Sequence, residues 1–259
     1  MLRSRIRLAA ALAVAALLLV AGCGDESGGS SGAAAPSEIK VFAAASLTAA
    51  FTELGQQYTS ANGGTKVTFN FAGSQALATQ IQQAAPADVF ASADLANMDK
   101  VKDLVGTSQN FASNLLAIVV EEGNPKGVKG LDDLARPDLK VVLAAPDVPA
   151  GKYAAEILGK AGVAVKPVSQ EDNVKAVVTK VSLGEADAGI VYVTDITAGG
   201  AKVEGVDIPR EQNVLATYPI ATVKASRAPD EAQAFMDLVL SAEGQQVLKQ
   251  YGFLPPPTT

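Results

Sequence analysis

The chain has 259 residues, 48% of them apolar, which is enough for one large domain or for two lobes of roughly 100 residues each. Its 21 basic and 27 acidic residues give a net charge of −6, and this balance argues against nucleic acid as a partner. Histidine is absent, which removes the commonest general base and transition-metal ligand, and the single Cys excludes an internal disulfide.

The N-terminus has the pattern of an export signal. Three Arg within the first seven residues precede an apolar run, Leu8–Val20, that is too short to be a comfortable membrane span. The run leads into Val-Ala-Gly-Cys ending at Cys23, which resembles the bacterial lipobox, in which the Cys is lipidated. We therefore expect residues 1–22 to be a lipoprotein signal peptide and Cys23 to anchor the exported protein on the outer face of the cell membrane. The alternative is an ordinary signal peptide with an incidental Cys.

The mature chain is expected to begin with a spacer. Residues 23–37 contain the Cys and then a Gly-, Ser- and Ala-rich segment without apolar periodicity, which is typical of a flexible tether. Removal of residues 1–22 takes away three Arg, so the mature chain has 18 basic and 27 acidic residues and a net charge of −9.

From residue 38 onward, short apolar runs alternate with amphipathic segments. In the amphipathic segments apolar residues recur every three or four positions, as in Leu95, Met98 and Val101, which predicts helices. The alternation predicts an α/β fold with mostly parallel sheets and flanking helices. The expected strands are Ile39–Ala44, Lys66–Ala72, Asp88–Ser92, Leu115–Glu121, Lys140–Ala145, Ala188–Val193 and Val214–Val223.

Two features favour two lobes with a cleft between them. The strand at 115–121 runs into the turn cluster Glu122–Pro125, where a second unit could begin, and the long apolar strand at 214–223 could carry the chain back. We expect one lobe to contain residues 38–117 and 216–259, and the other residues 118–215.

Two Ser residues follow expected strands at positions where helices begin. Ser46 follows three small residues in Phe-Ala-Ala-Ala-Ser, and Ser74 follows Phe-Ala-Gly. The N-terminus of a helix offers unpaired N–H groups and partial positive charge, so it can bind an anion without a counter-charge. Each Ser could also be a plain helix cap. Two in matching positions favour a ligand site, because open α/β sheets bind ligands at the carboxyl ends of their strands.

Three further segments share this design. Pro149 and Gly151 form a tight corner that exposes the amides near Ala150, and an acidic turn precedes Val174 in the first turn of a helix. Tyr192 ends a buried strand. Taken singly, the first two are ordinary loops and the Tyr is a core residue whose hydroxyl bonds to backbone.

Six motifs in one order resemble a known family. The sequences AAASL, FAGSQALATQI, APADVFASAD, VPAGKYA, EDNV and GIVY, with the closing stretch SAEGQQVLKQYGF, are similar to those of the periplasmic molybdate-binding proteins of ABC importers. The resemblance spans roughly residues 40–255. Gln75, where a small hydroxyl residue is common, and the Val-Thr pair after Tyr192 depart from the family pattern.

The resemblance implies the fold, the ligand and the partners. It implies a two-lobed periplasmic-binding-protein fold of the type II class, in its lipoprotein form, with the ligand cleft between the lobes. Molybdate, and with it tungstate, would be the ligand, and an ABC permease the membrane partner. No cofactor, no free metal cation and a monomer are implied. The implied ligands are the hydroxyls and amides of Ser46 and Ser74, the amides of Ala150 and Val174, and the hydroxyl of Tyr192.

A site with donors alone selects its anion by protonation state. Molybdate, tungstate and sulfate carry no proton near neutral pH, whereas hydrogen phosphate carries an O–H that needs an acceptor. The absence of carboxylates from the implied ligand set therefore disfavours phosphate. Sulfate differs from molybdate mainly in size, so a sulfate-type or a tungstate-selective protein is the alternative.

Other classes of protein fit the sequence less well. An S-x-x-K motif starts at Ser37, but it lies at the junction of tether and strand without its companion motifs, and no His or usable Cys could activate a nucleophile. We therefore expect no enzyme. A ferric-iron site would need carboxylates, His or paired Tyr. A purely structural lipoprotein would leave the five corners unexplained.

Overall fold

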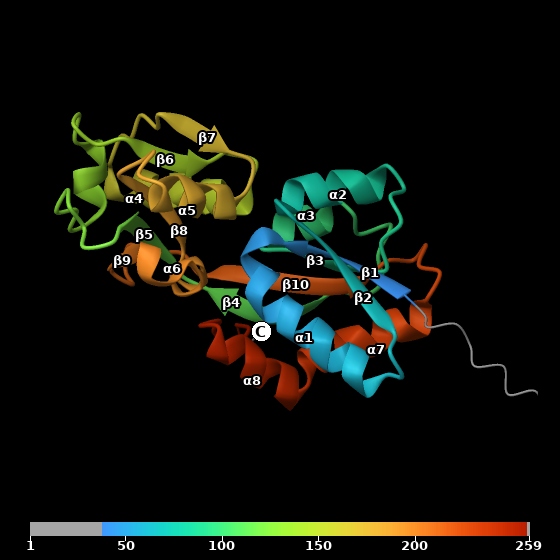
Figure 1. The fold of residues 1–259 in the computed structure, drawn as a ribbon. Coiled ribbons are helices and arrows are strands. Elements are labelled where there is room, and N and C mark those ends of the chain that lie inside the picture. The colour runs from blue at the N-terminus through green and yellow to red at the C-terminus, as the bar shows by residue number, and fades with distance from the viewer. Residues whose placement is uncertain (1–37, 258–259) are drawn as a thin grey trace, which may run out of the picture. The chain divides into compact units, whose positions relative to one another are not determined.

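The computed structural model describes residues 38–257, which form two five-stranded sheets with flanking helices (Figure 1). The expected signal peptide, Cys23 and the tether lie outside the described residues. We call the first sheet with its helices lobe 1 and the second sheet with its helices lobe 2.

Lobe 1 contains both ends of the described chain. Its sheet has the strand order β2-β1-β3-β10-β4. The strands are β1 (Glu38–Ala44), β2 (Lys66–Ala72), β3 (Val89–Ala91), β4 (Gln109–Asn114) and β10 (Ala216–Thr222). The helices are α1 (Thr48–Ala61), α2 (Ser74–Gln82), α3 (Leu95–Asp99), α7 (Pro229–Leu240) and α8 (Ala242–Gln250), with a 3-10 turn at Ala45–Leu47.

Lobe 2 is built from the middle of the chain. Its sheet has the order β7-β6-β8-β5-β9. The strands are β5 (Leu116–Glu121), β6 (Val141–Ala144), β7 (Ser169–Glu171), β8 (Ala188–Tyr192) and β9 (Val203–Asp207). The helices are α4 (Pro149–Ala161), α5 (Val174–Ser182) and α6 (Val193–Gly199), with 3-10 turns at Leu131–Ala135 and Gly200–Lys202.

The two sheets repeat one topology. In each, two neighbouring strand pairs are parallel and two are antiparallel, so the sheets are mixed. Every antiparallel pair involves β5 or β10. Strand β5 is the first strand after the chain enters lobe 2, and β10 is the first strand after it returns to lobe 1. A carboxylate ties the parallel part together in the same way in both lobes: Asp88 accepts from the N–H of Lys40, and Asp187 from that of Lys140, both at 2.7 Å.

Three strands were not expected from the sequence: β4, β7 and β9. Each lies at an edge of its sheet. Their sequences, QNFASN, SQE and VEGVD, lack a continuous apolar run. Strands β7 and β9 have solvent-facing side chains, as edge strands do. Strand β4 is mostly buried, and its polar residues Ser113 and Asn114 bond to distant segments. The seven expected strands are all present, within two residues at either end.

Apolar side chains cover both faces of the lobe 1 sheet. Helices α1, α7 and α8 lie on one face of the sheet (Figure 1). They pack there against a cluster of aromatic rings that includes Phe51, Phe111 and Phe235. On the other face α2 and α3 pack over Phe42 and Phe90. Both faces are buried, which explains why β1 and β3 are apolar throughout their centres.

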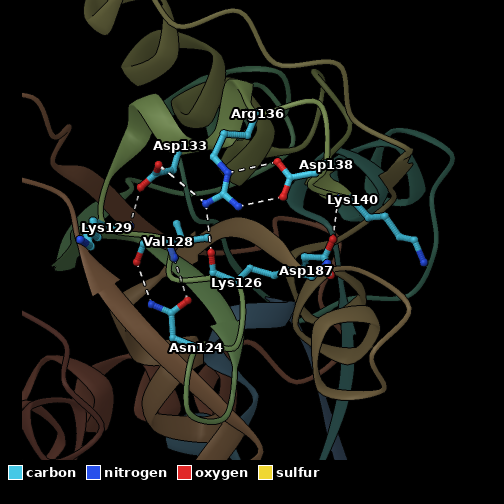
Figure 2. A network of polar contacts seen from close by, with 9 residues as sticks. All are labelled: Asn124, Lys126, Val128, Lys129, Asp133, Arg136, Asp138, Lys140 and Asp187. Carbon is cyan, nitrogen blue, oxygen red and sulfur yellow. Dashed lines mark hydrogen bonds and ion pairs between the residues drawn. The ribbon is translucent and has the colours of Figure 1, made fainter.

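The long connection between β5 and β6 is held by polar contacts (Figure 2). Arg136 makes a two-pronged ion pair with Asp138, with its Nη2 2.8 Å from the carboxylate, and donates to the carbonyl of Lys126. The side chain of Asn124 closes a turn by bonding both the N–H and the C=O of Val128. These contacts fix the path of the chain into β6. The expected corner at Ala150 follows the carboxyl end of this strand.

Candidate functional site

The two Ser residues lie where β1 and β2 end, but neither hydroxyl caps a helix. Ser46 lies in the 3-10 turn before α1, and Ser74 is the first residue of α2, after Gly73 as the cap residue. The Ser46 hydroxyl lies 3.1 Å from that of Tyr218, and the Ser74 Oγ accepts from the N–H of Ala93 at 3.0 Å. The interpretation of these residues as plain N-caps is therefore wrong.

The corners in lobe 2 place backbone amides at helix starts. Ala150 is the second residue of α4, after Pro149, and Val174 is the first residue of α5, which is capped by the side chain of Asn173. N–H groups in the first turn of a helix have no partner within the helix, and the helix dipole adds partial positive charge there. Both residues are buried, so their amides do not face bulk water.

Tyr192 lies at the carboxyl end of β8, and its side chain is 1% exposed. Its hydroxyl is buried and has no hydrogen-bond partner among the described residues. Burial raises the pKa of Tyr192 well above its ordinary value, so the hydroxyl keeps its proton. A buried hydroxyl usually has a partner, and one without it is a candidate ligand group.

All five expected residues line one cavity between the lobes. The cavity offers about 10 Å³ to the centre of a water-sized sphere, roughly what one water needs. Organic ligands of drug size occupy sites of roughly 300–1,000 Å³, so this cavity suits a ligand of only a few atoms. Its lining consists of Ala44, Ala45, Ser46, Ala72, Gly73, Ser74 and Ala93 from lobe 1, and Val148, Pro149, Ala150, Val174 and Tyr192 from lobe 2.

The cavity lining contains no charged side chain. Its side-chain polar groups are three hydroxyls, and the rest of its polar surface is backbone. Small residues dominate the lobe 1 side, which lets a ligand approach the backbone closely. The arrangement offers hydrogen-bond donors in a space shielded from water, as an anion site without counter-charge requires.

Contacts across the lobes surround the cavity. The Gln75 side chain donates to the carbonyl of Asp172 at 3.0 Å, and Lys152 pairs with Asp94 at 4.0 Å. A side chain on Gly73 would lie 2.5 Å from the Asp172 oxygen, so the lobes approach closely only because this residue is Gly. Gln75 thus bonds across the lobes and is not part of the lining.

A buried carboxylate lies behind Tyr192. Asp195, on α6, accepts from the N–H of Tyr192 at 3.1 Å. Burial raises the pKa of Asp195 to about 7, against the lowering effects of that hydrogen bond and of Lys175. The carboxyl does not line the cavity, so it acts on the position of Tyr192 and not on a ligand directly.

Sequence reasoning missed Tyr218 and Asn114, the polar residues behind Ser46. Ser46 and Tyr218 are 172 positions apart, and only the fold brings them together. Sequence reasoning also gave no role to Ala93, which lines the cavity. The ASAD stretch at the end of β3 has the same small-residue character as the other corners, so this similarity could have identified Ala93 as a candidate.

No helix within residues 38–257 has the length and apolar character needed to cross a membrane. The same range has no group of three or more His, Cys, Asp and Glu positioned to hold a metal ion.

Known proteins are similar to this chain over most of its length. The model of a family described as bacterial extracellular solute-binding protein matches residues 39–254. The molybdate-binding protein ModA of Mycobacterium tuberculosis is 45% identical over 249 residues, covering 92% of this chain and 95% of that protein. ModA of Escherichia coli is 32% identical over 230 residues, covering 83% and 88%. The periplasmic molybdate-binding protein of Azotobacter vinelandii has the same fold, with a TM-score of 0.72 at 20% identity over 85% of this chain and all of that one.

Proposed function

Because the chain belongs to the family of bacterial extracellular solute-binding proteins, we propose that it captures molybdate between its two lobes and delivers it to the permease of an ABC importer. The groups that bind it are the hydroxyls and amides of Ser46 and Ser74, the amides of Ala150 and Val174, and the hydroxyl of Tyr192. The proposed lobes are residues 38–117 with 216–259, and residues 118–215; the sheets place the first change of lobe two residues earlier, because β5 of lobe 2 begins at Leu116. The protein acts as a monomer and catalyses no reaction.

The observation that carries this proposal is the composition of the cavity wall. Its polar groups are hydroxyls and backbone amides, and no carboxylate or ammonium lines it. A dianion without a proton is bound there by several charge-assisted hydrogen bonds, each worth about 1.5–3 kcal/mol. Hydrogen phosphate brings a proton that finds no carboxylate to accept it, so it binds less well.

The choice of metal oxyanion is supported by the relatives. The protein that is 45% identical is named for molybdate binding, and that identity extends over nearly the whole chain. Tungstate has nearly the same size and charge as molybdate, so the same donors bind it with similar affinity. Sulfate fits the donor chemistry equally well and differs in size.

We also propose that the protein is a lipoprotein. Lipidation of Cys23, after cleavage behind residue 22, would hold the binding domain at the outer face of the cell membrane through the tether at 23–37. Changing Cys23 to Ser should move the protein from the membrane fraction to the soluble fraction. Equal membrane retention of both forms would contradict the anchor.

Competition calorimetry tests the ligand assignment. We expect the mature chain to bind molybdate and tungstate tightly and sulfate and phosphate weakly at one fixed salt concentration. Ser46→Ala and Ser74→Ala should each weaken molybdate binding by about tenfold or more, as the loss of one charge-assisted bond requires. Ser60→Ala is the matched control, because its hydroxyl bonds to Gln56 on the surface of α1. A preference for sulfate or phosphate would overturn the assignment.

A further inference from the structure

We propose that Tyr218 sets the width of the cavity and thereby the size of the oxyanion that can reach all of its donors. Tyr218 contacts one cavity residue from each lobe: its hydroxyl lies 3.1 Å from the Ser46 Oγ, and its ring packs against that of Tyr192. It does not line the cavity, so it is a positioning residue. The inference rests on the proposed function and concerns the choice between molybdate and sulfate, which the donor chemistry leaves open.

The two contacts of Tyr218 hold the lobes apart at the cavity. Ser46 lines the cavity from lobe 1 and Tyr192 lines it from lobe 2. The hydrogen bond ties the Tyr218 hydroxyl to Ser46 whichever of the two oxygens donates. The rings of Tyr192 and Tyr218 meet edge to face, with their centroids 5.8 Å apart and their planes inclined by 65°, an arrangement that aromatic pairs prefer. A phenol ring is rigid, so Tyr192 cannot move past it toward Ser46 without displacing Tyr218.

Tyr218 is itself held from behind. Its side chain is fully buried on β10, where Phe111 and Phe253 pack against its ring at centroid distances of 6.2 and 5.5 Å. The pairing of β10 with β4 shifts register between Tyr218 and Pro219 and skips Phe111. Such a bulge bends a strand and re-aims its side chains, and bulges are common beside functional sites. In a close-packed interior the ring cannot shift unless these neighbours shift as well.

A fixed width separates anions that differ only in size. Molybdate and sulfate are both tetrahedral dianions without a proton, and molybdate is the larger because its metal–oxygen bonds are longer. If the wall cannot contract, the smaller anion lies too far from at least one donor. A lost hydrogen bond to a charged ligand weakens binding by about tenfold or more. Under the proposed function the width matches molybdate, so sulfate is the anion that loses a bond.

The test measures the affinities of molybdate and sulfate by calorimetry in two variants. Tyr218→Phe releases Ser46 and keeps the ring against Tyr192, whereas Tyr218→Leu removes both contacts. We expect the preference for molybdate over sulfate to fall by about threefold in Tyr218→Phe and about tenfold in Tyr218→Leu, because donors in a loosened wall can follow the smaller anion. The preference for sulfate over hydrogen phosphate should stay the same, since these two anions have similar size and differ by a proton.

Tyr58 provides the matched control. It is also a buried Tyr of lobe 1, its hydroxyl donates to the carbonyl of Glu231 at 3.0 Å, and its ring packs against Phe235. It does not line the cavity. Tyr58→Phe and Tyr58→Leu should lower the melting temperature and leave the preference for molybdate unchanged. An equal loss of preference at Tyr58 would show that general loosening is the cause, and would overturn the inference.

The remaining outcomes separate this inference from the proposed function. Thermal melting shows whether each variant is folded, and if Tyr218→Leu does not fold, Tyr218→Phe alone decides. If the unaltered protein prefers molybdate and the folded Tyr218 variants keep that preference, Tyr218 does not set the width, while the proposed function stands. If the unaltered protein binds molybdate and sulfate equally well, it has no size selection and the inference fails. If it binds none of molybdate, tungstate, sulfate and phosphate, the proposed function fails, and the inference fails with it.

Discussion

Tyr192→Phe should stabilise the empty protein and weaken ligand binding at the same time. The Tyr192 hydroxyl is buried without a partner among the described residues, and such a group costs about 1–3 kcal/mol. Its removal should raise the melting temperature of the empty protein by about 2–4 °C for each kcal/mol recovered. The ring itself keeps its contact with Tyr218, so packing is unchanged.

The same substitution removes a donor from the cavity. A hydrogen bond to a charged ligand contributes about 1.5–3 kcal/mol, so molybdate should bind about 10- to 150-fold more weakly. Differential scanning calorimetry without ligand and titration calorimetry with molybdate measure the two effects on one sample.

Tyr58→Phe provides the contrast. The Tyr58 hydroxyl donates to the carbonyl of Glu231 at 3.0 Å, so its loss should lower the melting temperature. If Tyr192→Phe also lowers the melting temperature of the empty protein, the hydroxyl has a partner in solution and the reasoning is refuted. If it leaves molybdate affinity unchanged, Tyr192 is not a ligand.

Three further predictions concern the surroundings of the cavity. Gly73→Ala should weaken molybdate binding by about tenfold or more, because the new side chain would meet the Asp172 carbonyl oxygen; Gly159→Ala, in open space on α4, is the calorimetric control. Burial raises the pKa of Asp195 to about 7 in the folded protein, above the value of about 4 expected in the unfolded chain. The free energy of unfolding is therefore highest below about pH 4 and falls by up to about 4 kcal/mol as the pH rises through 7. Asp195→Asn should flatten this dependence in melting curves from pH 4 to 8, and an unchanged slope would exclude Asp195 as its source. Lys152→Ala removes the half-exposed end of the ion pair across the lobes, so affinity should change by less than about fivefold, and high salt should abolish the difference.

The positions of the five candidate site residues could be predicted because each corner is a local feature. A strand that ends in small residues and passes directly into a helix is visible in a few consecutive letters, as at Ser46 and Ser74. Parallel strands point their carboxyl ends to the same edge of a sheet, which is why the separate corners converge. The structure brings all five onto one cavity.

The hydrogen bonds that give the site its character could not be predicted in this way. The partner of Ser46 lies 172 positions away on a strand that returns from lobe 2. No periodicity links the two, and each residue alone is an ordinary buried polar group. The edge strands were missed for a related reason, since the pairing that makes β4 or β9 a strand comes from a distant neighbour and not from its own apolar content.

The acidic charge of the chain is compatible with anion capture because the site is enclosed. At physiological ionic strength the charge of an exposed carboxylate is screened over about 8 Å, and an enclosed cavity responds mainly to the dipoles in its wall. Asp94 of lobe 1 and Lys152 of lobe 2 are paired with each other at 4.0 Å, so they add little net field. Selection must then come from the donors in the wall and from their direction. Ser74 shows one such direction, because its Oγ accepts from the N–H of Ala93 and its proton is left for the cavity.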